Sequence, residues 1–466
     1  MVCVEIKIID AIECEVPSAL AKIIRPILSY TAVFYQQGPF GRKVRKEYEK
    51  STLRKYGDDY YRFLAGHLDR VVSHCREIGL YVTVTGEVEK LEYKRIPIKE
   101  MFSHLPLRDI QVDLQEGLVT KALDRQRGVL KAPTGVGKTV LGLNVVAAFV
   151  AKGANAVWLC HTKDLMYQAR DAAVKAGFTS VGCIGDGVKD TDKRVIFATR
   201  QSFIDVVRDI GHNFDVVVVD EVHHVSKSEG EYPTILNNLM APVRLGLTAT
   251  LPSEDKEAML AIEGNIGPLI GEVTIAEGEN KGIMAKIKIK FIKIPKSHQI
   301  SALRHYQDVY NAAIVQRYAR NRQIAEIAKD HTLQGDSVLI LVNRIEHGEN
   351  LLRACGDVGL KAQFVQGATE SDMRSKMKTA LNGKHIHCLI ATTIFKEGVD
   401  IPELNVIINA AGGKSEIATL QAIGRGLRLT KEKKELLLYD LLDLSHNYLI
   451  DHLAHRLDLY SSNDWI

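Results

Sequence analysis

The sequence feature that most constrains the fold is a glycine-rich run that ends in lysine and threonine. It reads APTGVGKT at 132–139, between a short apolar stretch at 128–131 and an apolar periodic stretch at 140–150. This order predicts a buried strand, a loop and a helix, in which backbone N–H groups close around phosphates at the helix N-terminus. A chance glycine-rich turn would not bring both the strand and the helix with it. The residues expected to bind a nucleoside triphosphate here are Pro133, Thr134, Gly135, Val136, Gly137, Lys138 and Thr139.

Two of these side chains have specific tasks in such a loop. Lys138 is placed to reach the β- and γ-phosphates, and the hydroxyl of Thr139 is placed to bind Mg²⁺. The sequence therefore predicts a nucleotide site with a divalent cation as cofactor.

Short apolar stretches alternate with helical patterns over most of the chain. Continuous β-branched runs separated by helices predict parallel sheets that are covered on both faces. The expected fold class is α/β, with two tandem parallel-sheet domains at 105–270 and 285–466 and a glycine-rich, charged connector at about 264–283. The second domain has no phosphate-binding loop of its own. The strand candidates are 128–131, 156–160, 195–198, 216–219, 245–247, 338–342, 388–391, 406–408 and 436–439.

Residues 1–100 are expected to form a small α+β module, with strands at 2–8 and 81–85 and helical material between them. The stretch between Gly41 and Lys55 contains seven lysines and arginines but only two glutamates, and eight of the sixteen tyrosines precede residue 100. Cations neutralise phosphates and aromatic rings stack on bases, which favours duplex or junction binding by this module. A solvated helix with tyrosines in the core is the alternative interpretation. The candidate nucleic-acid contacts are Arg42, Lys43, Arg45 and Lys46.

Composition excludes several classes of protein. A chain of 466 residues, 46% of them hydrophobic, can bury two or three domain cores. We see no apolar run that could span a bilayer and no secretory leader, so no membrane partner is expected. The seven cysteines are scattered without C-x-x-C spacing, which predicts neither a zinc site nor a disulfide framework. The expected location is therefore a reducing cytoplasm.

Two adjacent carboxylates follow the buried valines at 216–219. Open α/β sheets bind their ligands at the carboxyl ends of the strands. Asp220 can hold a hydrated Mg²⁺ there, and Glu221 can orient and deprotonate an attacking water. Burying two charges is costly unless a metal or a partner compensates, which argues against a purely structural pair. His223 either couples the nucleotide site to a neighbouring segment or, with His224, caps the strand end.

The order of these motifs resembles that of superfamily 2 helicases. AxxxxGKT at 132–139 is followed by DEVH at 220–223, TAT at 248–250 and QAIGRGLR at 421–428, and the resemblance spans about 107–430. It implies two RecA-like domains with ATP between them. In the family, arginines of the last motif reach across to the γ-phosphate, which assigns Arg425 and Arg428, together with Gln421, to catalysis. Two solvated helix charges are the alternative interpretation of the arginine pair.

The resemblance also assigns roles to shorter pieces of sequence. It implies that Arg108 and Gln111 contact the adenine. It also implies that Thr248 and Thr250, with His223, couple ATP hydrolysis to nucleic-acid binding. Gly398 and Asp400 are implied to lie near the nucleotide. Threonines at strand ends are common helix caps, so the shared order of these pieces carries the inference. The implied nucleic-acid contacts are Thr162, Lys163, Thr199, Arg200, Gln201, Gly367, Thr392 and Thr393.

Departures from the main RNA-helicase pattern narrow the resemblance. DEVH stands where that group has DEAD, and TAT replaces its usual SAT. These differences resemble phage recombination helicases of the UvsW type and excision-repair DNA helicases. The resemblance implies a monomeric, ATP-dependent DNA helicase or translocase on forked or branched DNA in recombination, replication or repair, in the host cytoplasm if the chain is of phage origin. An RNA helicase, and an ATP-switched translocase subunit that does not itself unwind, are the alternatives.

Overall fold

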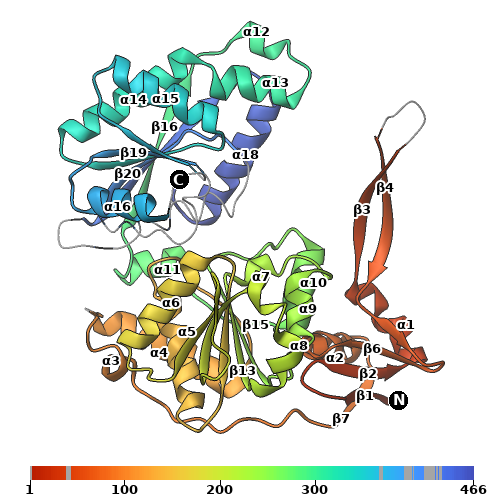
Figure 1. Ribbon diagram of the computed structural model, residues 1–466. Helices are drawn as coiled ribbons and strands as arrows, with labels where there is room; N and C mark the ends of the chain where they lie inside the picture. Colours follow the sequence, from red (N-terminus) through yellow and green to blue (C-terminus); the bar gives the residue numbers. More distant parts are fainter. Residues whose placement is uncertain are drawn as a thin grey trace. The chain divides into compact units, whose positions relative to one another are not determined.

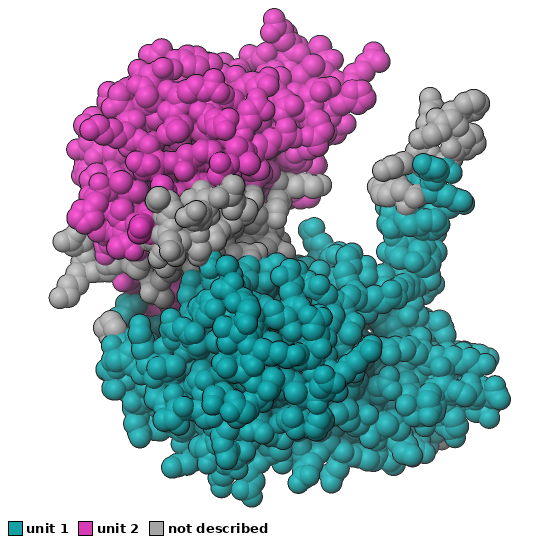
Figure 2. Space-filling model, in the orientation of Figure 1, with its two compact units in different colours: residues 1–132, 137–272 teal, residues 133–136, 273–466 magenta. Residues whose placement is uncertain are grey.

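The chain forms two compact units, which Figure 2 shows in different colours. Unit 1 comprises residues 1–132 and 137–272, and unit 2 comprises residues 133–136 and 273–466. Among the described residues, no helix combines the length and the apolar character needed to cross a membrane. The computed structural model describes residues 3–37, 43–105, 107–366, 371–392, 401, 403–413, 424, 426, 429 and 433–466.

Unit 1 begins with a small five-stranded sheet in the order β5-β6-β2-β1-β7 (Figure 1). Strands β1 and β7 pair in parallel, and the other neighbours are antiparallel. The α+β module of the expected fold class is present, with helices between its outer strands as expected, but further strands that were not expected lie there as well. Its elements are β1 (Cys3–Ile8), β2 (Glu13–Pro17), α1 (Ser18–Ile24), β5 (Arg54–Tyr56), β6 (Tyr60–Leu64), α2 (Leu68–Glu77) and β7 (Tyr81–Thr85).

A separate two-stranded hairpin projects from this module (Figure 1). Strands β3 (Ser29–Gln37) and β4 (Lys43–Ser51) pair only with each other among the described residues, and they are antiparallel. The basic stretch is therefore not a solvated helix. Three tyrosines in or beside it are not core residues either, because Tyr48, Tyr56 and Tyr60 are each about half exposed, whereas Tyr61 packs against the core of the module.

The small module docks on α10 (Lys256–Asn265) of the large sheet's domain. Nε and Nη2 of Arg70 donate three hydrogen bonds of 2.5–3.1 Å to the two carboxylate oxygens of Glu263. Burial would raise the pKa of Glu263, but His67 and Arg70 outweigh burial and lower that pKa to about 2. A charged contact of this strength fixes the module on the helix.

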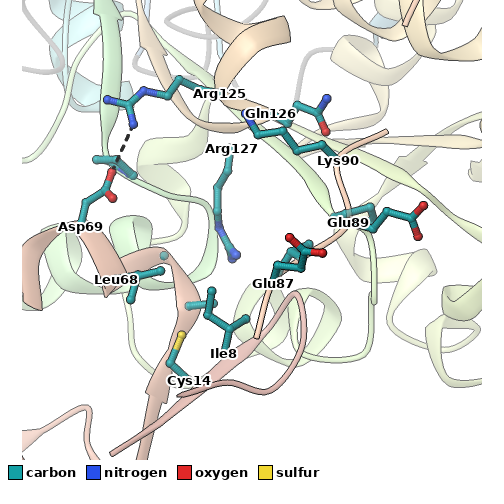
Figure 3. Close-up of a pocket in the computed structure, with 15 residues that line it drawn as sticks. Ile8, Cys14, Leu68, Asp69, Glu87, Glu89, Lys90, Arg125, Gln126 and Arg127 are labelled. Atoms are coloured by element: carbon teal, nitrogen blue, oxygen red, sulfur yellow. Dashed lines mark ion pairs between the residues drawn. The ribbon is translucent and has the colours of Figure 1, made fainter. Parts of the chain in front are cut away.

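A cavity of about 670 Å³ lies between the small sheet and the first residues of the large-sheet strands. Figure 3 shows Arg127 extending into it, between Ile8 and Glu87. Its Nη1 donates to the carbonyl of Ala11 and its Nε to that of Ile266, both at 2.8 Å, and burial lowers its pKa to about 10. Because Arg127 begins the strand that ends at the glycine-rich loop, the cavity lies at the opposite sheet edge from that loop.

The large sheet of unit 1 has the order β11-β10-β12-β9-β13-β14-β8-β15. All its neighbours are parallel except β10 and β11. Figure 1 shows α5 and α6 on one side of it and α9 and α10 on the other. Its strands are β8 (Arg127–Lys131), β9 (Ala156–Cys160), β10 (Val181–Gly185), β11 (Val188–Lys189), β12 (Val195–Thr199), β13 (Val216–Asp220), β14 (Val243–Thr248) and β15 (Leu269–Glu272). Its helices include α3 (Ile98–Met101), α4 (Asp109–Arg125), α5 (Lys138–Val150), α6 (Lys163–Lys175), α7 (Arg200–Phe203), α8 (Val207–Ile210) and α9 (Glu231–Leu236).

Close packing of α5 on this sheet depends on a glycine. The four valines of β13 are fully buried, and Trp158 of β9 packs against Phe197 of β12 with ring centroids 5.9 Å apart. A Cβ on Gly142 would lie 2.6 Å from Cη2 of Trp158 and 2.7 Å from Cδ1 of Leu247. Any larger residue would therefore push the helix, and the loop that precedes it, away from the sheet.

Unit 2 contains a six-stranded parallel sheet in the order β16-β21-β20-β17-β19-β18. Two buried ion pairs hold β21: Arg320 with Asp443, and Arg456 with Asp440. The expected connector at 264–283 is wrong in part, because β15 within it pairs with β8. The elements are α11 (Ile275–Asn280), β16 (Lys286–Ile294), α12 (His298–Ser301), α13 (Tyr306–Tyr310), α14 (Tyr318–Leu333), β17 (Ser337–Leu341), α15 (Ile345–Asp357), β18 (Gln363–Val365), α16 (Ser371–Asn382), β19 (Cys388–Ala391), β20 (Leu404–Asn409), β21 (Glu435–Asp443) and α18 (Asn447–Ser462).

Candidate active site

The glycine-rich loop joins the end of β8 to the first turn of α5. Gly135 and Gly137 have φ angles of 98° and 95°, in the left-handed region that favours glycine. A Cβ on Gly137 would lie 2.6 Å from Nε2 of Gln115, which is fully buried. Sequence analysis missed Gln115, although it lies one helical turn after Gln111 on α4 and thus on the same face.

The two adjacent carboxylates lie at the carboxyl end of β13, as expected. Nζ of Lys138 is 3.8 Å from Oε1 of Glu221, and the backbone N–H of Glu221 donates to Oδ1 of Asp220 at 3.0 Å. Glu221 has a φ angle of 50°, which is unfavourable for a residue with a side chain. Such strain is common at functional sites, where the surrounding structure holds the residue in place.

Asp220 and Glu221 respond differently to this environment. Burial, followed by the charge of Glu221, raises the pKa of Asp220. Burial would also raise the pKa of Glu221, but the Lys138 ammonium and then His223 outweigh it and lower that pKa. Glu221 is therefore ionised at neutral pH, whereas the Asp220 anion gains from any cation placed beside it.

The donor set at this edge suits Mg²⁺. The carboxylate of Asp220 and the hydroxyl of Thr139 are hard oxygen ligands, and Mg²⁺ usually takes one or two such groups together with waters and phosphates. The described residues contain no group of three or more His, Cys, Asp or Glu that could hold a metal by themselves. The oxygen donors of Asp220 and Thr139 fit a cation that is also bound by the phosphates of a nucleotide.

A chain of polar contacts leads from Glu221 through His223 to the TAT segment. The hydroxyl of Thr248 donates to the carbonyl of Thr250 at 2.7 Å, so it can only accept from Nδ1 of His223, which lies 3.0 Å away. The proton is thereby assigned to Nδ1, which also lies 3.3 Å from Oε2 of Glu221. His223 thus bonds to the neighbouring strand end, an arrangement that fits coupling better than capping.

A second chain of contacts leads from His224 to the strand ends on the other side. The rings of His224 and His161 stack with centroids 3.8 Å apart and an interplanar angle of 4°. Nε of Arg200 donates to Nδ1 of His161 at 3.2 Å, and its Nη1 forms an ion pair with Glu231. Glu231 was not singled out from the sequence, and His224 was considered only as a cap of the strand end, since its stack on His161 forms only in the folded chain.

Other predicted nucleic-acid contacts have structural partners. The hydroxyl of Thr162 caps α6 by accepting from the N–H of Leu165, and Lys163 pairs with Asp186 at 3.2 Å. Thr199 ends β12 and bonds to Ser202 at 3.2 Å, Gln201 is exposed on α7, and Thr392 is buried just after β19 in unit 2. The predicted adenine contacts, Arg108 and Gln111, lie at the start of α4. The roles assigned to these residues stay predictions.

Several predicted site residues lie outside the described residues, and their roles also stay predictions. They are Arg42, Gly367, Thr393, Gly398, Asp400, Gln421, Arg425 and Arg428, together with the side chain of Lys43.

Comparison with known proteins shows the family. A profile described as "Type III restriction enzyme, res subunit" matches residues 104–253, and one described as "Helicase conserved C-terminal domain" matches residues 319–430. Together the two matches cover more than half of the chain. They include strands that carry motifs in both parallel sheets. The chain belongs to the superfamily 2 helicases. Membership confirms the resemblance seen in the motifs and implies the use of ATP.

Two curated relatives and one solved structure illustrate the similarity. The chain is 24% identical over 439 residues to "ATP-dependent DNA helicase uvsW" of Enterobacteria phage T4, covering 86% of this chain and 87% of that protein. It is 27% identical over 390 residues to "DNA 3'-5' translocase XPB2" of Sulfurisphaera tokodaii, covering 76% and 85%. S. cerevisiae Dbp5 bound to RNA and ADP BeF3 has a TM-score of 0.53 at 14% identity, covering 78% of this chain and 94% of that one. The latter match confirms the expected RecA-like fold class.

Proposed function

We propose that this helicase is an ATP-driven motor that remodels forked or branched DNA. The observation that carries the proposal is the convergence of Lys138, Asp220 and Glu221 at one edge of a parallel sheet. Its direction towards DNA rests on the two relatives at 24% and 27% identity, which are named as a DNA helicase and a DNA translocase.

Each side chain at this edge has a definite task in the proposed reaction. Lys138 binds the β- and γ-phosphates, and the ionised Glu221 accepts a hydrogen bond from the attacking water and aligns it. Thr139 and Asp220 hold Mg²⁺, which when bound offsets negative charge on the phosphates. Arg425 and Arg428 supply further cations to the γ-phosphate in this proposal.

The contacts beyond Glu221 support coupling of ATP use to strand binding. His223 bonds to Thr248, and the stack of His224 on His161 leads to Arg200. In the proposal, the strand ends that carry Thr162, Thr199 and Thr392 grip the phosphate backbone. Such contacts position a strand without identifying its sequence.

The test is ATP hydrolysis without nucleic acid and with single-stranded DNA, linear duplex, forked or four-way DNA, and single-stranded RNA. Lys138→Ala and Glu221→Gln should both abolish turnover, but Glu221→Gln should still bind ATP. Lys152→Ala is the control, since Lys152 lies just beyond the same helix and pairs only with the exposed Glu92 among the described ion pairs. Normal turnover by Glu221→Gln would show that the role assigned to Glu221 is wrong.

The stimulation pattern separates the proposal from its alternatives. If branched DNA stimulates ATP hydrolysis most strongly, the result supports a remodelling helicase. If single-stranded RNA stimulates it most strongly, the substrate is RNA and not DNA. We also propose that the active species is a monomer. Gel filtration that finds activity only in a larger assembly would favour the translocase-subunit alternative.

A further inference from the structure

The β3–β4 hairpin has two chemically different faces. Directly opposed residues of an antiparallel pair share a face, so the register sorts the side chains. We call the two faces the inner face and the outer face. Among the described strand positions, the inner face has two lysines and no carboxylate, whereas the outer face has both glutamates of β4. The inner face comprises Tyr30, Ala32, Phe34, Gln36, Val44, Lys46, Tyr48 and Lys50, and the outer face comprises Ser29, Thr31, Val33, Gln37, Arg45, Glu47, Glu49 and Ser51.

The inner face carries an exposed aromatic pair. Phe34 and Tyr48 contact each other edge to face, with ring centroids 5.6 Å apart and planes at 74°. They are 43% and 49% exposed, because a two-stranded hairpin has no second layer to cover them. Lys46 lies directly opposite Phe34, so a cation flanks the rings. On the outer face, by contrast, Arg45 is already paired with Glu47 at 2.6 Å.

The base of the same face contacts the segment that follows the candidate active site. Oη of Tyr30 lies 2.7 Å from Oγ of Ser228, and Nζ of Lys50 lies 2.7 Å from Oε1 of Glu229. Within the described chain, residues 225–230 form neither helix nor strand and join the DEVHH turn to α9. The aromatic pair is therefore connected to the ATP site through one short segment.

We propose that the inner face binds nucleic acid where a duplex opens, with Phe34 and Tyr48 stacking on an exposed base and Lys46 holding an adjacent phosphate. Aromatic faces accept any base, and cations next to them bind the backbone. The inference rests on the proposed function and narrows the set of residues predicted to contact nucleic acid. Of the basic residues of β4, Lys46 contacts the bound nucleic-acid strand, and Arg45 does not.

A fluorescent residue at the face tests this directly. The two native tryptophans, Trp158 and Trp465, are 1% and 8% exposed and give a constant background. Phe34→Trp should be quenched saturably by forked DNA with unpaired arms. The matched control is Val33→Trp on the outer face, where Val33 is 44% exposed, and it should not be quenched. Equal quenching at both positions, or quenching by blunt duplex as strong as by the fork, would overturn the stacking assignment.

A second measurement uses loss of the rings. Phe34→Ala with Tyr48→Ala should weaken fork binding about 10-fold, given the usual contribution of base stacking, while Val33→Ala should not. ATP hydrolysis without nucleic acid should stay at the wild-type rate, and circular dichroism should confirm the fold. Retained fork affinity in the folded double variant would overturn the proposal.

The outcomes separate this inference from the proposed function. If wild-type hydrolysis is stimulated by forked DNA but the Phe34→Trp signal does not respond, the inner-face assignment is wrong and the proposed function stands. If no nucleic acid stimulates the wild type, the proposed function itself is wrong. A Phe34→Trp signal that changes with protein concentration in the absence of DNA would assign the face to a second copy of the chain and overturn the nucleic-acid assignment.

Discussion

Thr248→Val tests whether the hydrogen bond between His223 and Thr248 carries the coupling between ATP use and nucleic-acid binding. The substitution keeps the shape of the side chain and removes only the hydroxyl. That hydroxyl accepts from His223 at 3.0 Å and from the N–H of Thr250 at 3.2 Å, and it donates to the carbonyl of Thr250. His223 keeps its 3.3 Å contact with Glu221, so the catalytic carboxylate loses no direct partner.

The size of the effect follows from the burial of these groups. Thr248 and Thr250 are 0% and 3% exposed, so water cannot replace the lost hydroxyl. A buried polar group left without its partner costs about 1–3 kcal/mol, and we expect the free energy of unfolding to fall by that amount. The link to His223 is one neutral hydrogen bond of about 1 kcal/mol, which corresponds to about a fivefold loss in the ratio of stimulated to basal hydrolysis.

The assay measures ATP hydrolysis with and without saturating forked DNA, and urea unfolding monitors stability. Thr248→Ser is the matched control, because it restores the hydroxyl and should recover most of the stimulation. A folded Thr248→Val protein with wild-type stimulation would refute the coupling role of this hydroxyl. Equal losses of basal and stimulated rates would instead place Thr248 in the chemistry alone.

Three other contacts give separate expectations. The pKa of Glu263 is depressed to about 2 from an ordinary 4.5, so the stabilisation by this carboxylate is complete above about pH 4.5 and is lost as the pH falls towards 2. Arg70→Ala should lower the free energy of unfolding by about 2 kcal/mol at pH 7, and that free energy should then depend less on pH between 4.5 and 2. His161→Ala should reduce stimulated hydrolysis more than basal hydrolysis, and His161→Phe, which keeps a stacking ring, should lose less. Arg320→Met leaves Asp443 buried without its cation and should destabilise the chain by about 3–5 kcal/mol in urea unfolding.

The buried parallel strands could be predicted because their sequences carry the signal locally. The valine run at 216–219 is apolar at every position, as expected for a strand covered on both faces. Strand β16 (Lys286–Ile294) was missed although lysine and isoleucine alternate over its first five residues. Its partner β21 lies far along the chain, so the local pattern did not indicate a place for it in a sheet.

The hairpin shows how composition can identify chemistry without identifying structure. The excess of cations and tyrosines was visible, but a helix and a strand were both compatible with it. The structure resolves the choice, since Val44, Lys46 and Tyr48 share one face of a strand while Glu47 lies on the other. Arg320 is a further case, because an arginine is expected at the surface from its charge alone, but this side chain is buried against Asp443.

The motif DEVH led to Glu221 and His223 but stopped one residue short of what the fold uses. The turn η5 (Val222–His224) follows Glu221 and carries both histidines. It is anchored by Val222, which is fully buried. From this one rigid turn, His223 bonds to Thr248 on one side and His224 stacks on His161 on the other. A shift of the turn that follows a change at Glu221 would move both contacts together, because the same short backbone segment carries both rings. The two histidines therefore make a single structural link of what sequence motifs present as separate pieces.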